Sequence, residues 1–490
     1  MSQRFVIAGA GTTTPAPRCQ TIASSRLIVA SNRTAAGNVK RAGGLAVALR
    51  EALGPEDVWV GWSGRIFDFP SNRAKAVTED GINFALLDLS KPDYDGFYLG
   101  YSNSALWPAV HNRLDLVHFD AKAFRAYAGV NRKFASAIAE LAGPDDTVWV
   151  HDFHLFLTGR YLRELGVKAR MGMFLHTPFP PAEVFRAVPG HADLGASLAA
   201  FDLIGTQTRT DLRNLARYLA EDHGAEHIDG HRYRIADHEV QLLHCPIGMD
   251  VEGFSELPTS KPAKKAVKRL SKLVGKKRDF VIGVDRMDYS KGLPERFEGM
   301  GIVFDQYKET HGRLSFLQIA PPSRADVQEY QDLRERLDRL SGRINGDYGD
   351  LDWLPIRYLA KGYDREQLAG LYRYAKVGLV TPLQDGMNLV AKEYIAAQDP
   401  DDPGVLVLSR FAGSAEQMGG EMGALVVNPH DHQAIAHAVI RALRMPLEER
   451  RRRWQTLYEG LEAQDVHWWR ERFLRALRGE PTADLTIAAE

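Results

Sequence analysis

The sequence has little cysteine, little net charge and no long apolar run. Its two cysteines, Cys19 and Cys245, are far apart among 490 residues, which excludes a disulfide framework and suits a reducing cytosol. The 62 Lys and Arg residues nearly balance the 63 Asp and Glu residues, so no basic excess indicates nucleic acid as a partner. No apolar run is long enough for a transmembrane helix, and no basic amphipathic helix indicates a membrane surface. We therefore expect a cytoplasmic protein whose partners are small molecules.

The N-terminal end also lacks the pattern of a signal peptide, because its apolar segment Phe5–Ala8 is too short. The spacing of the glycines in Gly9–Thr14 is similar to a dinucleotide fingerprint. A dinucleotide site needs a helix after this turn, whereas Pro15 and Pro17 follow here. We therefore predict a flexible tail over residues 1–25 and no cofactor.

Short β-branched runs alternate with helical patterns along the rest of the chain. The length permits two large domains, and this alternation is typical of parallel sheets with helices on both faces. The lysine-rich stretch Pro258–Arg278 carries two prolines and is the best candidate for a linker. The fold class that we predict is α/β with two doubly wound domains. Its parts are a first domain over residues 26–257, a linker over 258–278, a second domain over 279–463 and a C-terminal helix within 464–490.

The stretch Thr381–Glu393 carries the strongest local signal for a ligand site. The apolar run Val377–Val380 before it is predicted to be a buried parallel strand, and a helix is predicted to follow from Asn388. Doubly wound proteins bind ligands at such a strand, turn and helix N-terminus, where free backbone N–H groups favour anions and sugar oxygens. Asp385 in the turn and Glu393 in the helix can hold a hexose hydroxyl and a ribose.

Basic residues follow two other predicted strands of the second domain. Arg286 and Lys291 lie five residues apart in a turn and can both reach one diphosphate, the first with a planar fork and the second with a compact charge. Arg324 follows the next strand, after the rigid pair Pro321–Pro322. Together with the acidic pair, these cations indicate an anionic donor and a polyhydroxy group.

Polar and aromatic residues also follow the predicted strands of the first domain. His151–His154 invites a zinc site, but no further ligand appears at a helical spacing, so we predict no metal. His176 follows the next strand in a rigid, proline-rich loop. Trp62 and Trp107 are expected in loops, where large aromatic side chains stack on ligands. The paired glycines Gly43–Gly44 before a helix let the backbone approach a phosphate.

Long motifs in a fixed order carry a resemblance to a known family. They are S-N-R at Ser31, A-G-G-L-A at Ala42, G-W-S-G at Gly61, S-N-x-x-L-W-P at Ser102, R-L-D-L-V at Arg113, H-D-x-H-L at His151, H-x-P-F-P at His176, D-Y-S-K-G-L-P-E-R-F at Asp288, G-R-I-N-G at Gly342 and V-T-P-L-x-D-G-M-N-L-V-A-K-E-Y at Val380. On these motifs nearly the whole chain resembles the retaining glycosyltransferases that make trehalose 6-phosphate, glycosyltransferase family 20.

The resemblance implies two Rossmann-like domains that face a central cleft, the GT-B arrangement, and no metal. It implies transfer of glucose from a nucleotide-glucose to glucose 6-phosphate, with UDP-glucose as the expected donor and ADP- and GDP-glucose left open. The anomeric configuration would be retained by front-face attack, with the leaving phosphate accepting the acceptor's proton. The motif D-x-D-G-T of a phosphatase is absent, so we expect the product to stay α,α-trehalose 6-phosphate.

The resemblance also assigns roles to individual residues. The residues implied to bind the acceptor, glucose 6-phosphate, are Arg33, Trp62, Tyr98, Trp107, Asp152 and Arg324. Those implied to bind the donor are Gly44, His176, Arg286, Lys291, Asp385, Gly386, Met387, Asn388, Leu389, Val390 and Glu393. The implied catalytic set is Asp152, His176, Arg286, Lys291 and Asp385. The tryptophan-rich helix at the C-terminal end is expected to cross back and brace the first domain.

Two alternatives stay open on the same fold. A related synthase would use glycerol 3-phosphate as its acceptor and make a glucosylglycerol phosphate. The aromatic residues Trp62, Tyr98 and Trp107 favour a hexose phosphate, because a three-carbon acceptor needs less stacking surface. The other alternative, a catalytically silent sugar-phosphate sensor, is disfavoured because the implied catalytic set is intact. A homo-oligomer is also compatible with the sequence.

Overall fold

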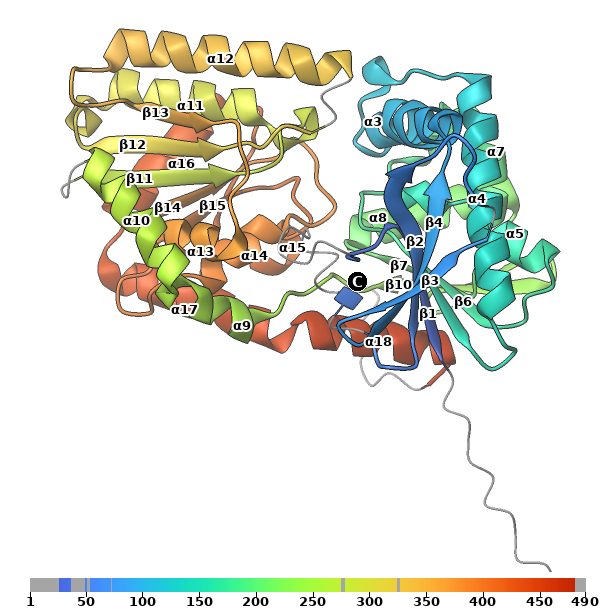
Figure 1. Cartoon of the computed structure of the whole chain (residues 1–490). Helices are drawn as coiled ribbons and strands as arrows, with labels where there is room; N and C mark the ends of the chain where they lie inside the picture. The colour runs from blue at the N-terminus through green and yellow to red at the C-terminus, as the bar shows by residue number, and fades with distance from the viewer. Residues whose placement is uncertain are drawn as a thin grey trace, which may run out of the picture.

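The computed structural model of this chain describes residues 26–36, 49–50, 53–71, 73–274, 278–323 and 327–480. Two sheets lie side by side, each covered by helices (Figure 1). Three of the sequence-based expectations lie outside the described residues, namely the tail over residues 1–25, the Gly43–Gly44 loop and Arg324.

The first sheet has ten strands in the order β3-β4-β2-β1-β5-β6-β7-β10-β9-β8. Their bounds are β1 Leu27–Arg33, β2 Val58–Ile66, β3 Lys75–Glu79, β4 Ile82–Leu89, β5 Thr147–His151, β6 Arg170–Phe174, β7 Leu203–Thr206, β8 Glu226–Asp229, β9 Arg232–Ile235 and β10 His238–His244. In this spatial order, the seven strands from β4 through β10 are parallel to one another. Strand β3 pairs antiparallel with β4 at one edge, and β9 and β8 add antiparallel pairings beyond β10 at the other. In β1, Ile28 and Ala30 belong to one core and Leu27 and Val29 to the other, so the whole run is apolar.

Helices cover both faces of this sheet. They are α2 Lys91–Asp93, η2 Tyr94–Leu106, α3 Trp107–Val110, η3 Leu114–Leu116, α4 Ala121–Leu141, η4 Phe153–Leu155, α5 Thr158–Glu164, α6 Ala182–Arg186, α7 His191–Leu198 and α8 Arg209–His223. The segment η2 is a π-helix that packs closely on α4. A Cβ at Gly96 would lie 2.4 Å from the Ala126 side chain, and one at Gly100 would lie 2.7 Å from that of Ala123. The two glycines therefore fix the position of the helix that carries Tyr98.

The second sheet has six parallel strands in the order β13-β12-β11-β14-β15-β16. Their bounds are β11 Asp279–Val284, β12 Leu314–Ile319, β13 Ile356–Leu359, β14 Val377–Val380, β15 Val405–Ser409 and β16 Leu425–Val427. In β11, Val281 packs into the core on one face, whereas Phe280 and Ile282 pack into the core on the other. Burial on both faces again explains the continuous apolar runs.

The helices of the second domain include one in the segment expected to be a linker. They are α9 Val251–Glu256, η5 Leu257–Thr259, α10 Lys261–Val274, η6 Tyr289–Lys291, α11 Leu293–Gln306, η7 Lys308–Thr310, α12 Gln328–Tyr348, α13 Arg365–Tyr374, α14 Leu389–Ala396, α15 Ala415–Met418, α16 His432–Arg444 and α17 Leu447–Ala463. The lysines of α10 lie on its solvated side, while Ala263 is buried against Gly370 of α13. Most of the stretch 258–278 is thus a helix packed on the second domain, because its apolar positions recur at a helical spacing.

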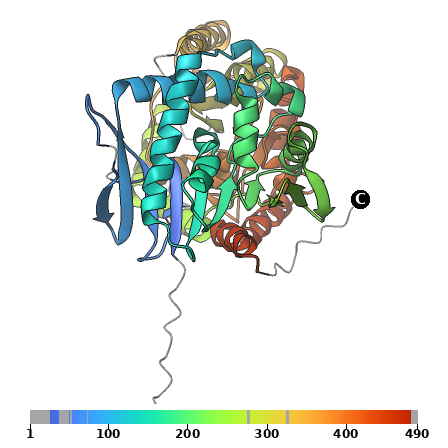
Figure 2. The same ribbon diagram turned by 90° about the vertical axis from the view of Figure 1, so that its right-hand side faces the viewer.

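The chain crosses between the two domains twice, and the two crossings touch. Residues 245–250 lead from β10 to α9, and residues 464–465 lead back from α17 to α18, Val466–Arg478. The Val466 N–H donates to the Met249 carbonyl across 3.2 Å, and a Cβ at Gly248 would lie 2.1 Å from the Asp465 backbone. Helix α18 then lies along the first sheet, as two perpendicular views show (Figure 1 and Figure 2).

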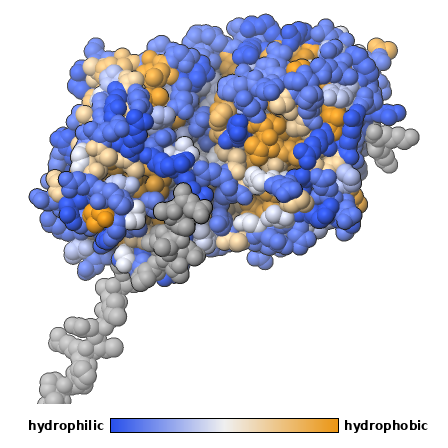
Figure 3. Space-filling view, turned by 180° about the vertical axis from the view of Figure 1, so that it is seen from behind, coloured by the Kyte–Doolittle hydropathy of each residue, from blue (hydrophilic) through white to orange (hydrophobic). Residues whose placement is uncertain are grey.

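Seen from behind, the surface is largely hydrophilic, with hydrophobic patches between the hydrophilic regions (Figure 3). Among the described residues, no helix has both the length and the apolar character that crossing a membrane requires.

Candidate active site

A cleft of about 460 Å³ lies between the two domains. Its first-domain wall includes Trp107, Asp152 and His176, and its second-domain wall includes Arg286 and Asp385. Most of these residues follow the carboxyl end of a parallel strand: Asp152 follows β5, Arg286 follows β11 and Asp385 follows β14. The two sheets therefore present their ligand-binding edges to one shared space.

The second domain supplies two cations to the cleft, in different states. Lys291 is 8% exposed and its Nζ donates to Oδ2 of Asp385, 94 residues further along the chain. The Arg286 guanidinium is exposed and lies over the Trp107 ring of the other domain, 5.8 Å from its centroid. Among the described residues Arg286 has no ion pair, so its charge is available to an anion in the cleft.

The turn before α14 brings backbone N–H groups to the same place. Asn388 precedes the helix with a φ of 72°, and its Nδ2 donates to Asp385 Oδ2 across 3.0 Å. No side chain among the described residues caps the first turn, where Leu389 and Val390 line the cleft. Gly386 has no room for a side chain, because a Cβ there would lie 2.0 Å from the His176 carbonyl oxygen. The turn is therefore locked against the first domain, with a positive helix end facing the cavity.

Glu393 lies one turn further along α14 and also lines the cleft. Its Oε2 accepts a hydrogen bond of 3.4 Å from the Tyr372 hydroxyl of α13. Burial raises the pKa of Glu393 to about 7, with Arg365 and the Tyr372 hydrogen bond acting in the opposite direction. This carboxyl is therefore poised to change its protonation near neutral pH.

His176 is a neutral group in this site. Burial lowers its pKa to about 3, so it carries no charge at physiological pH. Its Nε2 lies 3.0 Å from Nδ1 of His151, and its Nδ1 lies 3.5 Å from Nε2 of Gln207. Both ring nitrogens of His176 thus lie near protein partners that hold the neutral ring in place, and the cations that line the cleft belong to the second domain.

Asp152 has an unusual backbone conformation, with a φ of 72° that few residues other than glycine adopt. Its Oδ1 accepts hydrogen bonds from the His176 N–H at 3.2 Å and the Thr177 N–H at 3.3 Å. Burial raises the pKa of Asp152 to about 6, and the backbone donors offset part of that effect. The local strain and the bonds to the loop aim this carboxylate at the cleft.

The predicted aromatic residues are not in loops. Trp62 lies in β2, buried, and its Nε1 donates to the Arg65 carbonyl at 2.8 Å. Tyr98 lies in η2 and Trp107 begins α3. The expectation failed because Gly64, at a φ of +82°, lets β2 continue through Ser63–Gly64 with a register shift instead of turning.

Trp62, Tyr98 and Arg33 form a separate cluster beside the cleft. The Arg33 guanidinium lies 5.0 Å from the Trp62 ring centroid, and the Trp62 and Tyr98 centroids are 6.1 Å apart. Tyr98 stacks on His154, whose neighbour Phe153 packs against Trp107 in the cleft wall. The residues assigned to the acceptor therefore form two adjoining groups, and Arg324 lies outside the described residues.

The cleft brings together most of the predicted donor and catalytic residues. Those that line it are Trp107, Asp152, His176, Arg286, Lys291, Asp385, Gly386, Met387, Asn388, Leu389, Val390 and Glu393. Gly44 lies outside the described residues. Within the described ranges, no group of three or more His, Cys, Asp or Glu side chains is arranged to hold a metal ion.

The structure adds acidic residues in and beside the cleft that the sequence interpretation missed. Asp285 lines the cleft, and its Oδ2 accepts from Nη2 of the fully buried Arg296 at 2.9 Å. Asp288 accepts hydrogen bonds from Trp107 of the first domain, Tyr330 of α12 and the Ser290 N–H. Asp285 directly follows the strand that precedes Arg286, so its position at a strand end was a usable signal.

The chain is similar to known proteins over almost all of its length. The model of "Glycosyltransferase family 20" matches residues 18–479. A trehalose-6-phosphate synthase of Klebsiella pneumoniae is 44% identical over 457 residues, which cover 93% of this chain and 95% of that protein.

Solved structures are similar to the same extent. A UDP-forming α,α-trehalose-phosphate synthase from Burkholderia vietnamiensis has a TM-score of 0.89 and 45% identity, and the match covers 93% of this chain and 99% of that one. One from Burkholderia xenovorans, in complex with glucose-6-phosphate, has a TM-score of 0.88 and 43% identity, with 93% and 100% covered. The two facing Rossmann-like domains thus confirm the predicted GT-B arrangement, and the chain belongs to glycosyltransferase family 20.

Proposed function

We propose that this chain is a retaining glucosyltransferase that transfers glucose from UDP-glucose to glucose 6-phosphate, giving UDP and α,α-trehalose 6-phosphate. The observation that carries the proposal is the cleft itself, in which an exposed cation and a helix N-terminus of one domain face a polar wall of the other. Relatives matched over nearly their whole length are named for this reaction, and one was solved with glucose-6-phosphate bound.

The second domain is the donor side in this proposal. The donor diphosphate lies against Arg286 and Lys291, with the N–H groups at the start of α14 facing the glucose. Lys291 exchanges its bond to Asp385 for the phosphate, which leaves Asp385 free to accept from a glucose hydroxyl. Glu393 accepts from the ribose hydroxyls in its ionised form.

The first domain is the acceptor side. Asp152 accepts from hydroxyls of glucose 6-phosphate near the reacting centre, and Trp107 packs against the sugar. The cluster of Arg33, Trp62 and Tyr98 extends this side towards the acceptor phosphate. The planar guanidinium of Arg33 matches the geometry of a phosphate, so it suits that group.

The chemistry follows from where charge develops. The bond between the glucosyl C1 and the diphosphate oxygen breaks, and the bond from C1 to the acceptor O1 forms on the same face. The acceptor hydroxyl passes its proton to the leaving phosphate oxygen, so no carboxylate nucleophile is required, unlike in retaining glycosidases. Negative charge grows on the diphosphate, where Arg286 and the α14 dipole stabilise it in the transition state.

A turnover assay tests the proposal directly. Glucose 6-phosphate is offered with UDP-, ADP- and GDP-glucose in turn, in the presence of EDTA, and the product is identified by NMR. We expect an α,α-1,1-linked disaccharide phosphate with UDP-glucose, and its formation in EDTA would establish that no free metal is needed. Glycerol 3-phosphate is offered as the acceptor in a parallel assay. Product formation with glycerol 3-phosphate alone, or ligand binding without nucleotide release, would contradict the proposal.

A further inference from the structure

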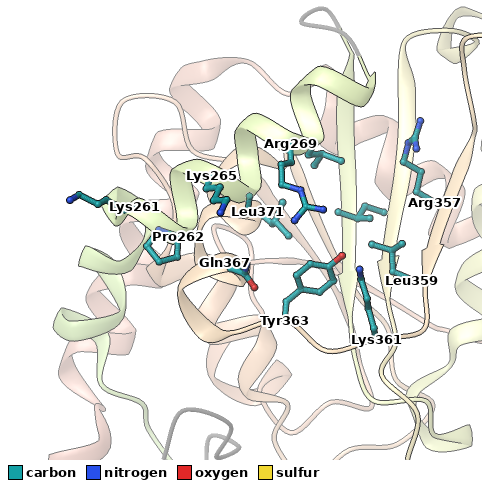
Figure 4. Close-up of a pocket in the computed structure, with 13 residues that line it drawn as sticks. Lys261, Pro262, Lys265, Arg269, Arg357, Leu359, Lys361, Tyr363, Gln367 and Leu371 are labelled. Carbon is teal, nitrogen blue, oxygen red and sulfur yellow. The ribbon is translucent and has the colours of Figure 1, made fainter.

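A second cavity, of about 560 Å³, lies in the second domain and belongs to no part of the cleft. Its floor is formed by Leu270 of α10, Leu317 of β12, Leu359 of β13 and Leu371 of α13. The side chains around it come from the same elements and from the segment after β13 (Figure 4). We call this cavity the basic groove.

The groove exists because the helical layer is incomplete at the sheet edge. Strand β13 is the edge strand, and α10 and α13 cover this face of the sheet only in part. Leu317 is buried, whereas Leu359 and Leu270 are only partly covered. Apolar side chains in a concavity of this size are typical of small-molecule sites.

The rim of the groove is positively charged on both sides. Lys261, Lys265 and Arg269 recur every four residues along one face of α10, and Arg357 and Lys361 belong to the opposite wall. The lining contains no Asp or Glu. Within the described part of the chain, none of these five residues forms an ion pair.

Of these five side chains, Arg269 and Lys361 extend from opposite walls over the apolar floor, whereas Arg357 points away from them (Figure 4). Arg269 reaches from α10 towards the Tyr363 ring and Lys361, whereas Lys261 extends away at the far end (Figure 4). The Arg357 Nε is buried and has no hydrogen-bond partner in the described structure. Because Arg357 forms no ion pair within the described part of the chain, its positive charge is uncompensated, and burial and the neighbouring Arg278 lower its pKa.

We propose that the basic groove binds a small amphipathic anion, with an apolar body on the leucine floor and a phosphate head between Arg269 and Lys361. A dianionic phosphate matches a pair of cations from opposite walls, and arginine holds phosphate with two parallel hydrogen bonds. The apolar floor selects a ligand with a hydrocarbon or aromatic part over inorganic phosphate.

Helix α13 connects the groove to the cleft. Gln367 and Leu371 line the groove, whereas Leu368 and Tyr372, one residue further on in each case, line the cleft. Tyr372 donates to Glu393, the residue assigned to the donor ribose. A ligand in the groove therefore acts on donor binding through one rigid element, a consequence that rests on the proposed function.

Binding is tested first, on the full chain and without substrates. Octyl phosphate is titrated calorimetrically below its micelle concentration, with octyl glucoside as the neutral ligand of equal tail length. We expect binding of octyl phosphate only, and weakening of about tenfold or more in K265E/R269E, because close charge pairs across an interface contribute strongly. The matched control K264E/K268E changes the net charge equally on exposed positions of the same helix outside the groove, and should bind as the wild type does.

Each other outcome overturns the inference. Absent binding, equal binding of octyl glucoside, or equal weakening in both double variants would exclude an anion site in the groove. Binding to phosphatidylglycerol vesicles in flotation, without binding of octyl phosphate, would indicate a membrane surface instead of a small ligand.

The coupling is tested by the KM for UDP-glucose with and without saturating octyl phosphate. We expect a change of about fivefold or more in the wild type, the lower end of the usual range of coupling between sites, and none in K265E/R269E. An unchanged donor KM would overturn the coupling. A protein that binds octyl phosphate but shows no turnover would contradict the proposed function and leave the groove intact.

Discussion

At the scale of single residues, the cleft contains two cations in different states: Arg286 has no ion pair among the described residues, and Lys291 is paired. Arg286 is exposed and faces the cavity, whereas Lys291 is held by Asp385. A side chain that is free in the absence of substrate loses no existing bond when an anion arrives. The electrostatic contribution to the transition state is therefore expected to come mainly from Arg286.

Replacing Arg286 by Ala should lower kcat about 100-fold or more and leave the KM for glucose 6-phosphate nearly unchanged, because charge grows on the diphosphate only in the transition state. Steady-state kinetics with both substrates varied would measure this. Arg313→Ala is the control. Arg313 is exposed and lies immediately before β12, at the amino ends of the strands, whereas the cleft lies at their carboxyl ends. An unchanged kcat in Arg286→Ala would contradict the assignment.

The raised pKa of Glu393 leads us to predict that donor binding depends on pH. Because burial raises its pKa to about 7, the neutral form dominates below that pH and the carboxylate dominates above it. Only the carboxylate accepts from two ribose hydroxyls, so the Kd for UDP-glucose should rise up to about tenfold between pH 8 and pH 6. Calorimetry across this range would measure the change.

The variant Glu393→Gln separates this residue from the other buried carboxyls that line the cleft, Asp152 and Asp285. Its Kd for UDP-glucose should be higher than that of the wild type at pH 8 and independent of pH down to pH 6. Asp152, with a pKa of about 6, belongs to the acceptor side and should leave donor binding unaffected. A slope that persists in Glu393→Gln would assign the titration to another group.

Much of the site was predictable at this scale, because strand ends, turns and motifs mark where ligand groups gather. Arg286, Asp385 and Glu393 were named from such positions. Their pairings were not predictable: the contact between Lys291 and Asp385 joins residues 94 apart, and Arg296 is buried under Asp285. Sequence spacing carries no information about such long-range contacts until the topology is known.

At the scale of elements, the interior strands and both edge strands of the second sheet were predictable, whereas the strands at the edges of the first sheet were not. A strand buried on both faces, such as β11 or β14, is apolar throughout and stands out in the sequence. The edge strands β3, β8 and β9 are short and mostly exposed, so their composition resembles that of loops. The lysine-rich helix α10 was predicted to be a linker, because its many lysines dominate the sequence pattern and its apolar face is narrow.

The turn before α14 is the element whose geometry the function depends on most closely. Gly386→Ala would place a Cβ 2.0 Å from the His176 carbonyl oxygen, so the turn and the first-domain loop must separate. Displacement of about 1 Å at a catalytic centre costs about 100-fold in rate, and we expect at least this loss in kcat/KM. Kinetics together with thermal unfolding would separate misplacement from unfolding.

Gly342→Ala in α12 is the matched control for this change. No heavy atom lies within 4 Å of a Cβ at Gly342, and alanine favours a helix over glycine by about 1 kcal/mol. This variant should keep full activity and unfold at a slightly higher temperature. Equal activity of the two alanine variants would show that the Gly386 contact is not needed for catalysis.

At the scale of the whole molecule, the two domains are joined by more than one connection. The paired crossings at Gly248 and Asp465 lie side by side, and the buried Lys392 donates to the Ile247 carbonyl across 2.7 Å. Helix α18 leaves the second domain and completes a core of the first one. The paired crossings and α18 therefore hold the cleft at a defined opening, a property that local sequence patterns do not express.

Helix α18 follows the second domain in the chain but packs on the first, so we predict that a substitution in α18 destabilises the first domain. Trp469 is fully buried, and its ring centroid lies 4.9 Å from that of Trp149 in β5 and 5.0 Å from that of Phe174 in β6. Trp469→Ala leaves a large cavity in the first domain, which should lose about 3–5 kcal/mol of stability. Hydrogen exchange of the β5 and β6 amides should accelerate accordingly, although the substitution lies some 300 residues away in sequence.

Trp468→Ala is the control, because Trp468 is only partly buried, packs at the margin of the same core and lies under the Arg472 guanidinium. It should leave exchange in β5 and β6 nearly unchanged. Exchange that accelerates in the second domain instead, or in neither domain, would mean that α18 is an appendage. In that case the first domain would have to be stable without it, and the cleft opening would be set by residues 245–250 alone.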